Sequence, residues 1–199
     1  YYDLVKLNEN RTLYAIADVS GKGVQAALLM ANLQAFLKSI CKQNLALDAA
    51  SNLINDLVSD NTTMGSFITF FWGVLNDETK EMIYVNAGHN PPLLIRNGKI
   101  TKLKVGGMIL GVIQTIEPYK SEKVQLLSGD TFVLFTDGIT EAMDKDYREY
   151  SDEKLEDLVV KIANKSAEEI LDKIKISVAE FTKGAEQSDD ITCLVIKVK

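Results

Sequence analysis

Three aspartates that are far apart in the chain, Asp18, Asp137 and Asp189, each lie at one end of an apolar, strand-like run. A carboxylate at a strand end is held by the sheet and has open space in front of it. Carboxylates that approach one another repel and raise one another's pKa, so three of them converge only around a positive group. The chain is therefore predicted to fold so that three strand ends meet around a divalent cation.

The composition is that of an ordinary globular protein, with 199 residues of which 46% are hydrophobic and 25% are charged. This length fits one domain, and we expect a single domain over residues 1–199. The net charge of −6 argues against a nucleic-acid partner, because phosphate binding needs a basic face. No apolar run reaches the ~18 residues that a membrane span needs, so we expect no membrane contact.

The two cysteines, Cys41 and Cys193, lie in apolar surroundings and form no closely spaced pair. We interpret them as buried thiols of a reducing compartment, rather than as a disulfide or as metal ligands. This interpretation predicts a cytoplasmic protein.

The order of the expected elements predicts an α+β fold, because the helices are segregated from the strands instead of alternating with them. A first strand at 12–18 is followed by helices over 24–41 and from Asp48. The β-rich middle contains the strand pairs 67–76 with 81–87, 92–96 with 99–104, and 122–127 with 131–136. Helices from Ser151 and after Ser166 precede a closing strand at 191–198. Asn97-Gly98 is a strong hairpin signal, since both turn positions require a positive φ.

Periodicity predicts which helix faces are buried. In the first helix the expected buried face is Val24, Ala27, Leu28, Ala31, Ala35 and Phe36. In the second helix Asp48 is expected to be the N-cap, and Ala49, Leu53, Ile54 and Leu57 are expected to be buried. Ser166 and Glu169 have the spacing of a capping box at the start of the last helix.

The predicted site has only oxygen ligands, which favours Mg²⁺ or Mn²⁺ over Zn²⁺. Two such ions can hold a hydroxide between them and receive a phosphoryl oxygen, so no side-chain nucleophile is required. Taken singly, each aspartate has a simpler explanation: a turn or helix cap for Asp18, a turn for Asp137, and an edge charge for Asp189 with Asp190. The combination of three favours the metal site.

Two further residues have both a functional and a structural interpretation. The lone histidine, His89, could act as a general acid, but the glycine and prolines around it favour a structural role. Lys22, between two glycines, could approach a phosphate, but a solvated loop lysine is the simpler interpretation. Arg11 lies in an expected hairpin turn and is a poor candidate for a phosphate clamp.

Four segments together resemble the SpoIIE/RsbU-type branch of the metal-dependent (PPM, 2C-like) serine/threonine protein phosphatases. They are Asp18-Val-Ser-Gly-Lys-Gly-Val-Gln-Ala-Ala-Leu28, Asn86-Ala-Gly-His-Asn-Pro-Pro92, Gly129-Asp130 with Thr136-Asp-Gly-Ile-Thr-Glu-Ala142, and Asp189-Asp-Ile-Thr192. Each segment alone is modestly specific, whereas four in the family's order are highly specific. The resemblance spans essentially the whole chain.

The resemblance implies a four-layer α-β-β-α sandwich of two antiparallel sheets flanked by helices. It also implies two Mn²⁺ or Mg²⁺ ions bound by Asp18, the Val19 carbonyl, Asp137 and Asp189, with Asp190 beside them. The implied reaction is hydrolysis of phosphoserine or phosphothreonine by a metal-bound water or hydroxide.

The same resemblance implies the biological setting. The expected substrate is a small phosphorylated protein of the anti-sigma-factor antagonist type, in a partner-switching pathway of bacterial stress signalling. The chain would be the C-terminal catalytic part of a longer protein, with an upstream sensory or receiver domain and a possible homodimer.

The first motif departs from the family pattern, which resembles Gly-Gly-Asp-Tyr-Tyr-Asp. Asp3 matches the second aspartate of that pattern, and the metal ligand is expected just before Tyr1. This departure leaves open a catalytically impaired module that keeps the fold and binds a partner. A different two-metal enzyme, such as a nucleotide phosphodiesterase or cyclase, is less favoured because the sequence has no phosphate-loop signature.

Overall fold

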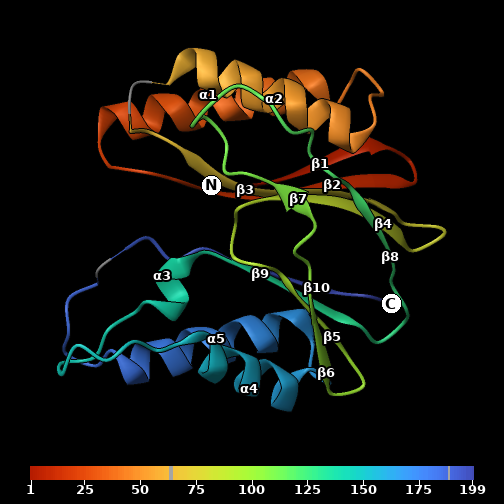
Figure 1. The fold of residues 1–199 in the computed structure, drawn as a ribbon. Coiled ribbons are helices and arrows are strands. Elements are labelled where there is room, and N and C mark those ends of the chain that lie inside the picture. Colours follow the sequence, from red (N-terminus) through yellow and green to blue (C-terminus); the bar gives the residue numbers. More distant parts are fainter. Residues whose placement is uncertain (63–64, 188) are drawn as a thin grey trace. The chain divides into compact units, whose positions relative to one another are not determined.

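A computed structural model describes residues 1–62, 65–187 and 189–199, and the chain divides into two compact units. Unit 1 comprises Tyr1–His89 and Lys104–Gln125, and unit 2 comprises Asn90–Leu103 and Leu126–Lys199. Each unit contains one sheet and one pair of long helices (Figure 1). Among the described residues, no helix combines the length and the apolar character that crossing a membrane requires.

The sheet of unit 1 has the strand order β1-β2-β3-β4-β7, and β8 also pairs with β4. The strands are β1 (Tyr2–Asn8), β2 (Arg11–Val19), β3 (Ile68–Asn76), β4 (Glu81–Ala87), β7 (Gly106–Gly107) and β8 (Glu122–Gln125). All pairs are antiparallel except β4 with β7. The sheet is therefore antiparallel, as predicted, apart from this one short parallel pair. The parallel pair depends on Gly106, because a Cβ at this position would lie 1.8 Å from the Asn86 carbonyl oxygen.

Helices α1 (Val24–Ile40) and α2 (Leu47–Asn61) lie side by side over one face of this sheet (Figure 1). Their buried side chains meet those of β2 and β3 in one core, in which Leu33, Ile54 and Trp72 are almost fully enclosed. This core fixes the helices to the strand that carries Asp18.

The predicted buried face of α1 is wrong. The structure buries Leu29, Leu33, Leu37 and Ile40. Val24 and Leu28 are 76% and 61% exposed. The helix is apolar on nearly every side, so its periodicity does not distinguish the face that packs from the face that does not.

The start of α2 also differs from the prediction. Ala46 is the N-cap, and Asp48 lies inside the first turn, where a carboxylate favours the positive end of the helix. The buried residues are Leu47, Ala50, Ser51, Ile54, Asn55 and Val58, so of the four predicted residues only Ile54 is buried.

A strap formed by residues 108–119 crosses α2 and is held mainly through its backbone. Asn55 binds both the amide of Gly111 and the carbonyl of Ile113, each at 3.0 Å. Further helix side chains bind the strap: Asp56 accepts from the Thr115 amide, Asn52 accepts from the Tyr119 amide, and Ser59 donates to the Ile113 carbonyl. The burial of Asn55 is thus explained by the loop that it holds, whereas the buried Ser51 accepts from the Trp72 indole at 2.9 Å.

The sheet of unit 2 has the order β10-β9-β5-β6 and is antiparallel throughout. The strands are β5 (Leu93–Arg96), β6 (Lys99–Lys102), β9 (Thr131–Phe135) and β10 (Cys193–Lys197). The Asn97-Gly98 turn between β5 and β6 is confirmed, with φ of 50° and 75°. The predicted pairing of 122–127 with 131–136 is wrong, because β8 pairs with β4 whereas β9 pairs with β5 and β10.

Three helices belong to unit 2: α3 (Asp137–Thr140), α4 (Asp152–Ile162) and α5 (Ala167–Phe181). The capping box at the start of α5 is confirmed, since Ser166 and Glu169 exchange both bonds. Helices α4 and α5 pack on the sheet around Leu155, Ile170 and Val133 (Figure 1).

Candidate metal centre

Asp137 is the first residue of α3 and is separated from the end of β9 only by Thr136, so a strand end does present it as predicted. Its Oδ1 atom is buried and has no hydrogen-bond partner in the part of the chain that the structure describes. Carboxylate oxygens of Asp137 and of the exposed Asp189 lie within 4.8 Å of each other. Unit 2 therefore brings together two of the three predicted carboxylates.

Thr136 fixes the distance between the two segments that carry these carboxylates. Its Oγ1 donates to the Asp190 carbonyl at 3.2 Å and accepts from the Thr192 amide at 3.0 Å. The Thr136 amide donates to the Thr192 carbonyl at 3.1 Å. Gly138 completes the contact, because a Cβ there would lie 2.3 Å from the Asp190 carbonyl oxygen. The Thr-Asp-Gly and Asp-Asp-Ile-Thr motifs are thus hydrogen-bonded to each other and closely packed.

Glu141 is a residue of this region to which the sequence reasoning gave no role. Partial burial raises the pKa of its carboxyl, and the negative charges of Asp137, Glu149 and Asp189 raise it further. The only sequence signal was its place in the segment that starts at Thr136. Its electrostatic link to both carboxylates becomes visible only in the folded unit.

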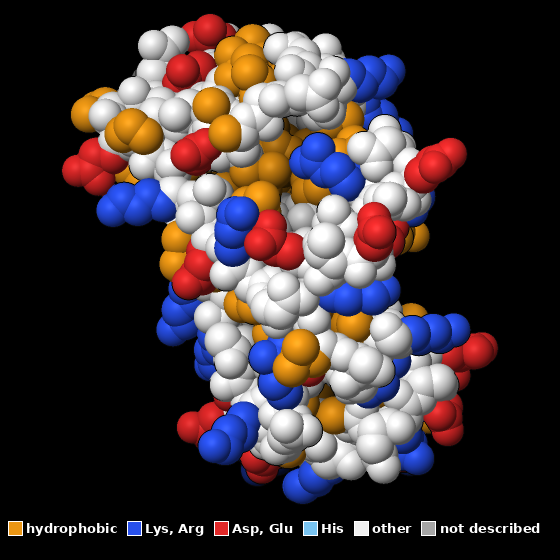
Figure 2. Space-filling model, turned by 90° about the vertical axis from the view of Figure 1, so that its right-hand side faces the viewer, with side chains coloured by type: hydrophobic (Ala, Val, Ile, Leu, Met, Phe, Trp, Pro, Cys, Tyr) orange, Lys and Arg blue, Asp and Glu red, His pale blue; other side chains and the backbone are white. Residues whose placement is uncertain are grey.

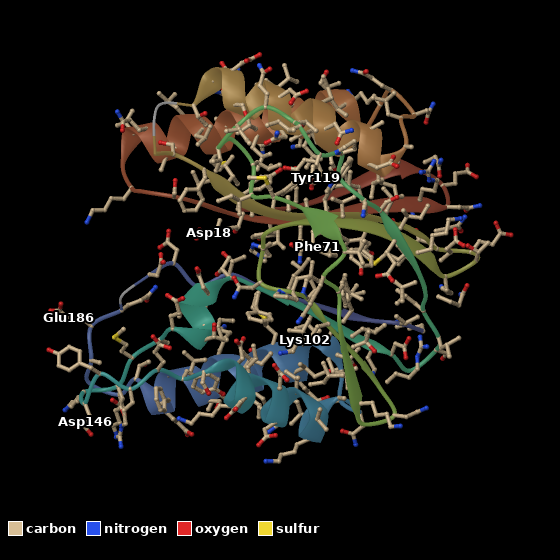
Figure 3. All side chains as sticks on the ribbon, in the orientation of Figure 1. Asp18, Phe71, Lys102, Tyr119, Asp146 and Glu186 are labelled. Carbon is tan, nitrogen blue, oxygen red and sulfur yellow. The ribbon has the colours of Figure 1, made fainter. Side chains whose placement is uncertain are left out.

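Asp18 lies in unit 1, one residue before the end of β2, and is labelled in Figure 3. In the sheet register it is opposite Thr69, and Val19 is opposite Ile68. Beyond the strand, Ser20 closes the edge, because its amide donates to the Phe67 carbonyl and its hydroxyl accepts from the Phe67 amide. The Asp18 carboxylate is therefore held by paired backbone on both sides.

The glycine turn after Asp18 has the backbone geometry that the sequence suggests. Gly21 and Gly23 have φ of 85° and 78°, a region that other residues rarely adopt. Lys22 between them is exposed, which agrees with the solvated-lysine interpretation.

Asp3 is engaged elsewhere in unit 1. It accepts from the Tyr1 hydroxyl at 3.0 Å and pairs with Lys38 at 3.3 Å. These contacts agree with the expectation that Asp3 is not a metal ligand.

His89 is 3% exposed, and its backbone is bracketed by the Asn86 side chain, which accepts from its amide and donates to its carbonyl. Its Nδ1 lies 2.9 Å from the Thr69 hydroxyl. This burial supports a structural role. Cys41 and Cys193 are free thiols within the described ranges, and both are only partly buried instead of fully buried as predicted.

The residues of unit 2 fit a hard divalent cation. Leaving a buried carboxylate oxygen without a donor or cation is unfavourable by about 1–3 kcal/mol or more. A cation beside Asp137 Oδ1 would remove that penalty and the repulsion from Asp189. Oxygen ligands suit Mg²⁺ or Mn²⁺, and neither cysteine is near enough to form a thiolate cluster with the described acidic residues.

Comparison with known protein families identifies the family of the chain. Residues 8–199 match the family model described as Stage II sporulation protein E (SpoIIE). The chain belongs to the SpoIIE family. It is 31% identical over its full length to a protein named phosphoserine phosphatase RsbU, from Bacillus subtilis (strain 168), and it covers 59% of that protein. It is 26% identical to protein IcfG of a Synechocystis strain, over 98% of the chain and 35% of that protein. The chain thus spans less than two thirds of the length of each of these relatives.

Solved structures share the fold. The SiaA-PP2C domain of Pseudomonas aeruginosa matches the whole chain with a TM-score of 0.86 at 19% identity, over 80% of that structure. The PP2C phosphatase domain of SpoIIE from Bacillus subtilis, solved with a fragment of its regulatory domain, matches with a TM-score of 0.83 at 21% identity. In that match the whole chain covers 58% of the structure. These likenesses confirm the predicted α+β class and the PPM phosphatase fold.

Proposed function

We propose that this chain is a metal-dependent phosphatase of phosphoserine or phosphothreonine in proteins. The observation that carries the proposal is the Asp137–Asp189 pair, with its buried oxygen, in a chain of the SpoIIE family. Asp18, the Val19 carbonyl, Asp137 and Asp189 are proposed to bind two Mn²⁺ or Mg²⁺ ions. A crystal structure of the related RsbX, described as a complex with magnesium, supports a hard divalent cation.

The ions, when bound, would supply Lewis acidity and lower the pKa of a water, which makes a protein nucleophile unnecessary. The residues of the chain then have three roles. Asp18 and Asp137 orient the ions from two rigid backbone positions. Thr136 and Gly138 keep the Asp189 segment at the right distance from Asp137. Glu141 adds a third carboxyl group beside the pair, and desolvation together with the charges of Asp137, Glu149 and Asp189 raises its pKa.

The substrate and the setting are proposed from the relatives. One relative is named a phosphoserine phosphatase, and one solved structure contains the RsbU and RsbW domains of a single Mycobacterium tuberculosis protein. We therefore propose a small phosphorylated anti-sigma-factor antagonist as substrate, in a cytoplasmic stress pathway that controls a sigma factor. Residues 1–199 would form one catalytic domain at the C-terminal end of a longer protein, with an upstream sensory or receiver domain and a possible homodimer.

The test is phosphate release from a serine-phosphorylated antagonist protein in the presence of Mn²⁺. We expect Asp18→Asn and Asp137→Asn each to lower kcat by at least about a hundredfold, because each removes a charge that holds the ions. Asp172→Asn on the exposed side of α5 is the matched control and should leave the rate unchanged.

Calorimetry with Mn²⁺ separates the alternatives. If the chain binds Mn²⁺ but releases no phosphate from any phosphoprotein, it is a binding module with a phosphatase fold. Equal turnover by the wild type and both aspartate variants would overturn the proposed site. Faster turnover of nucleotides than of phosphoproteins would overturn the substrate class.

A further inference from the structure

Unit 1 contains a cavity of about 430 Å³ at the opposite end of β2 from Asp18 and Val19. It lies between the first residues of β2, the end of β1 and the connection from α1 to α2. Its apolar lining includes the buried Leu13, Ile40 and Trp72 and the more exposed Val5, Leu7 and Leu45. Figure 2 shows a hollow with hydrophobic side chains at its bottom in the upper part of the view, and Lys or Arg side chains beside it. A volume of this size is typical of small-molecule sites.

The charged residues that line this cavity are all basic. Lys6, Arg11 and Lys42 contribute to its lining, and no Asp or Glu is among the described residues that do so. This is notable in a chain with 28 acidic and 22 basic residues. A concave site with one sign of charge over apolar walls attracts the opposite charge.

Two of the three cations are available to a ligand. Lys6 is paired with Asp77 at 2.6 Å. Arg11 and Lys42 are exposed and form no ion pair with any residue that the structure describes. The cavity therefore combines an apolar interior with two unneutralised cations at its edge.

We propose that this cavity binds a small amphipathic anion, with its hydrocarbon part against Val5, Leu7 and Leu45 and its carboxylate or phosphate beside Arg11 and Lys42. Burial of the hydrocarbon part supplies most of the affinity. The charged hydrogen bonds to the head group select an anion over a neutral ligand of the same length. The site is separate from the proposed phosphatase activity and requires no metal.

The test uses the fluorescence of Trp72, the only tryptophan of the chain, as a reporter inside the cavity. Decanoate, kept below its micelle concentration and added without divalent metal, should change the emission saturably. Decanol should bind about tenfold more weakly, since it lacks the charge, and acetate should give no change because it lacks the hydrocarbon part. Decyl phosphate should bind like decanoate if the head-group charge is what matters.

The double variant Arg11→Gln/Lys42→Gln should weaken decanoate binding about tenfold and leave decanol binding unchanged. Lys104→Gln/Lys120→Gln is the matched control, because it removes two exposed charges of the same unit outside the cavity. Equal affinity for decanoate and decanol, or no saturable change with either, would overturn the proposal. The ligand series on the wild-type chain gives this answer even if the double variant fails to fold.

Discussion

Thr136 contributes to the candidate site by positioning the two segments that carry its carboxylates. Thr136 is not expected to touch a metal, yet its hydroxyl joins two segments that are 54 residues apart in the chain. It uses both hydrogen-bonding capacities of that hydroxyl, one toward Asp190 and one toward Thr192. Valine has the same shape without this capacity, so Thr136→Val isolates the contribution of the hydroxyl.

We expect Thr136→Val to lower the free energy of unfolding by about 1 kcal/mol, because the partly buried Asp190 carbonyl and Thr192 amide lose their partner. It should also weaken Mn²⁺ binding by calorimetry, since the Asp189 segment is no longer held beside Asp137. Thr182→Val at the end of α5 is the control, because that hydroxyl only caps the local Val178 carbonyl. Unchanged Mn²⁺ affinity in Thr136→Val would show that the segment is held by other contacts.

The sequence suggested the acidic residues of the proposed site but not the residues that position them. Asp18, Asp137 and Asp189 were found because a charge at the end of an apolar run is visible in one dimension. Thr136 and Glu141 were not assigned roles, because their roles depend on atoms brought together by folding. A hydrogen bond between distant segments leaves no periodic signal.

At the scale of elements, helix α1 shows when hydrophobic periodicity does not predict the buried face. Apolar residues occupy several sides of the helix, so two faces compete for the core and only tertiary packing decides between them. Amphipathic α5, with its capping box and alternating charge, was placed correctly. The Asn97-Gly98 hairpin was also placed correctly, because its turn signal is local.

The two faces of α1 predict different responses to truncation. Leu33→Ala should lower the free energy of unfolding by about 2–5 kcal/mol, since Leu33 is fully buried. Leu28→Ala removes the same atoms from the exposed face and should change it by less than about 0.5 kcal/mol. Chemical denaturation measures both values. A large effect at Leu28 would mean that this face is covered in solution.

The ion pair between Lys6 and Asp77 predicts that the free energy of unfolding depends slightly on pH. The hydrogen bond from Lys6 is the main reason that the pKa of Asp77 lies below its ordinary value of 3.8. Asp77 also accepts from Thr12, so it ties β1 and β2 to the β3 end. A lowered pKa stabilises the fold above the ordinary pKa, and this contribution is lost as pH falls through the folded value.

We therefore expect Asp77→Asn to reduce stability by less than about 1 kcal/mol at neutral pH, because the pair is partly exposed. The difference from wild type should shrink as pH falls below 3.8. Denaturation curves between neutral pH and pH 3 measure it, with Glu9→Gln as the exposed control in the same hairpin. A difference that grows toward low pH would contradict the assigned cause.

At the scale of the whole molecule, the chain passes between the units three times, after His89, after Leu103 and after Gln125. Each unit nevertheless has a core of its own. The proposed ligands come from both, with Asp18 in unit 1 and Asp137 in unit 2. If these residues share ions, cation binding must stabilise both units together.

Mn²⁺ at a hundredfold excess over its Kd should then raise the free energy of unfolding by about 2.7 kcal/mol. Hydrogen exchange should slow in β2 as well as in β9 and β10. Asp18→Asn should abolish the protection in both units, whereas Asp172→Asn should preserve it. Protection confined to unit 2 would show that Asp18 is not a ligand.

The strap over α2 affects which positions of this chain tolerate amino-acid substitution. Because the helix binds mostly main-chain atoms of residues 108–119, the exposed side chains of the strap are free to vary as long as its backbone path, the buried Leu110 and Tyr119, and Gly111 with its positive φ are kept. The selective constraint falls instead on Asn52, Asn55 and Asp56 of the helix. In a library of all single substitutions, the loop should tolerate many changes and these polar helix positions few, the reverse of the usual ranking of loops and helix surfaces.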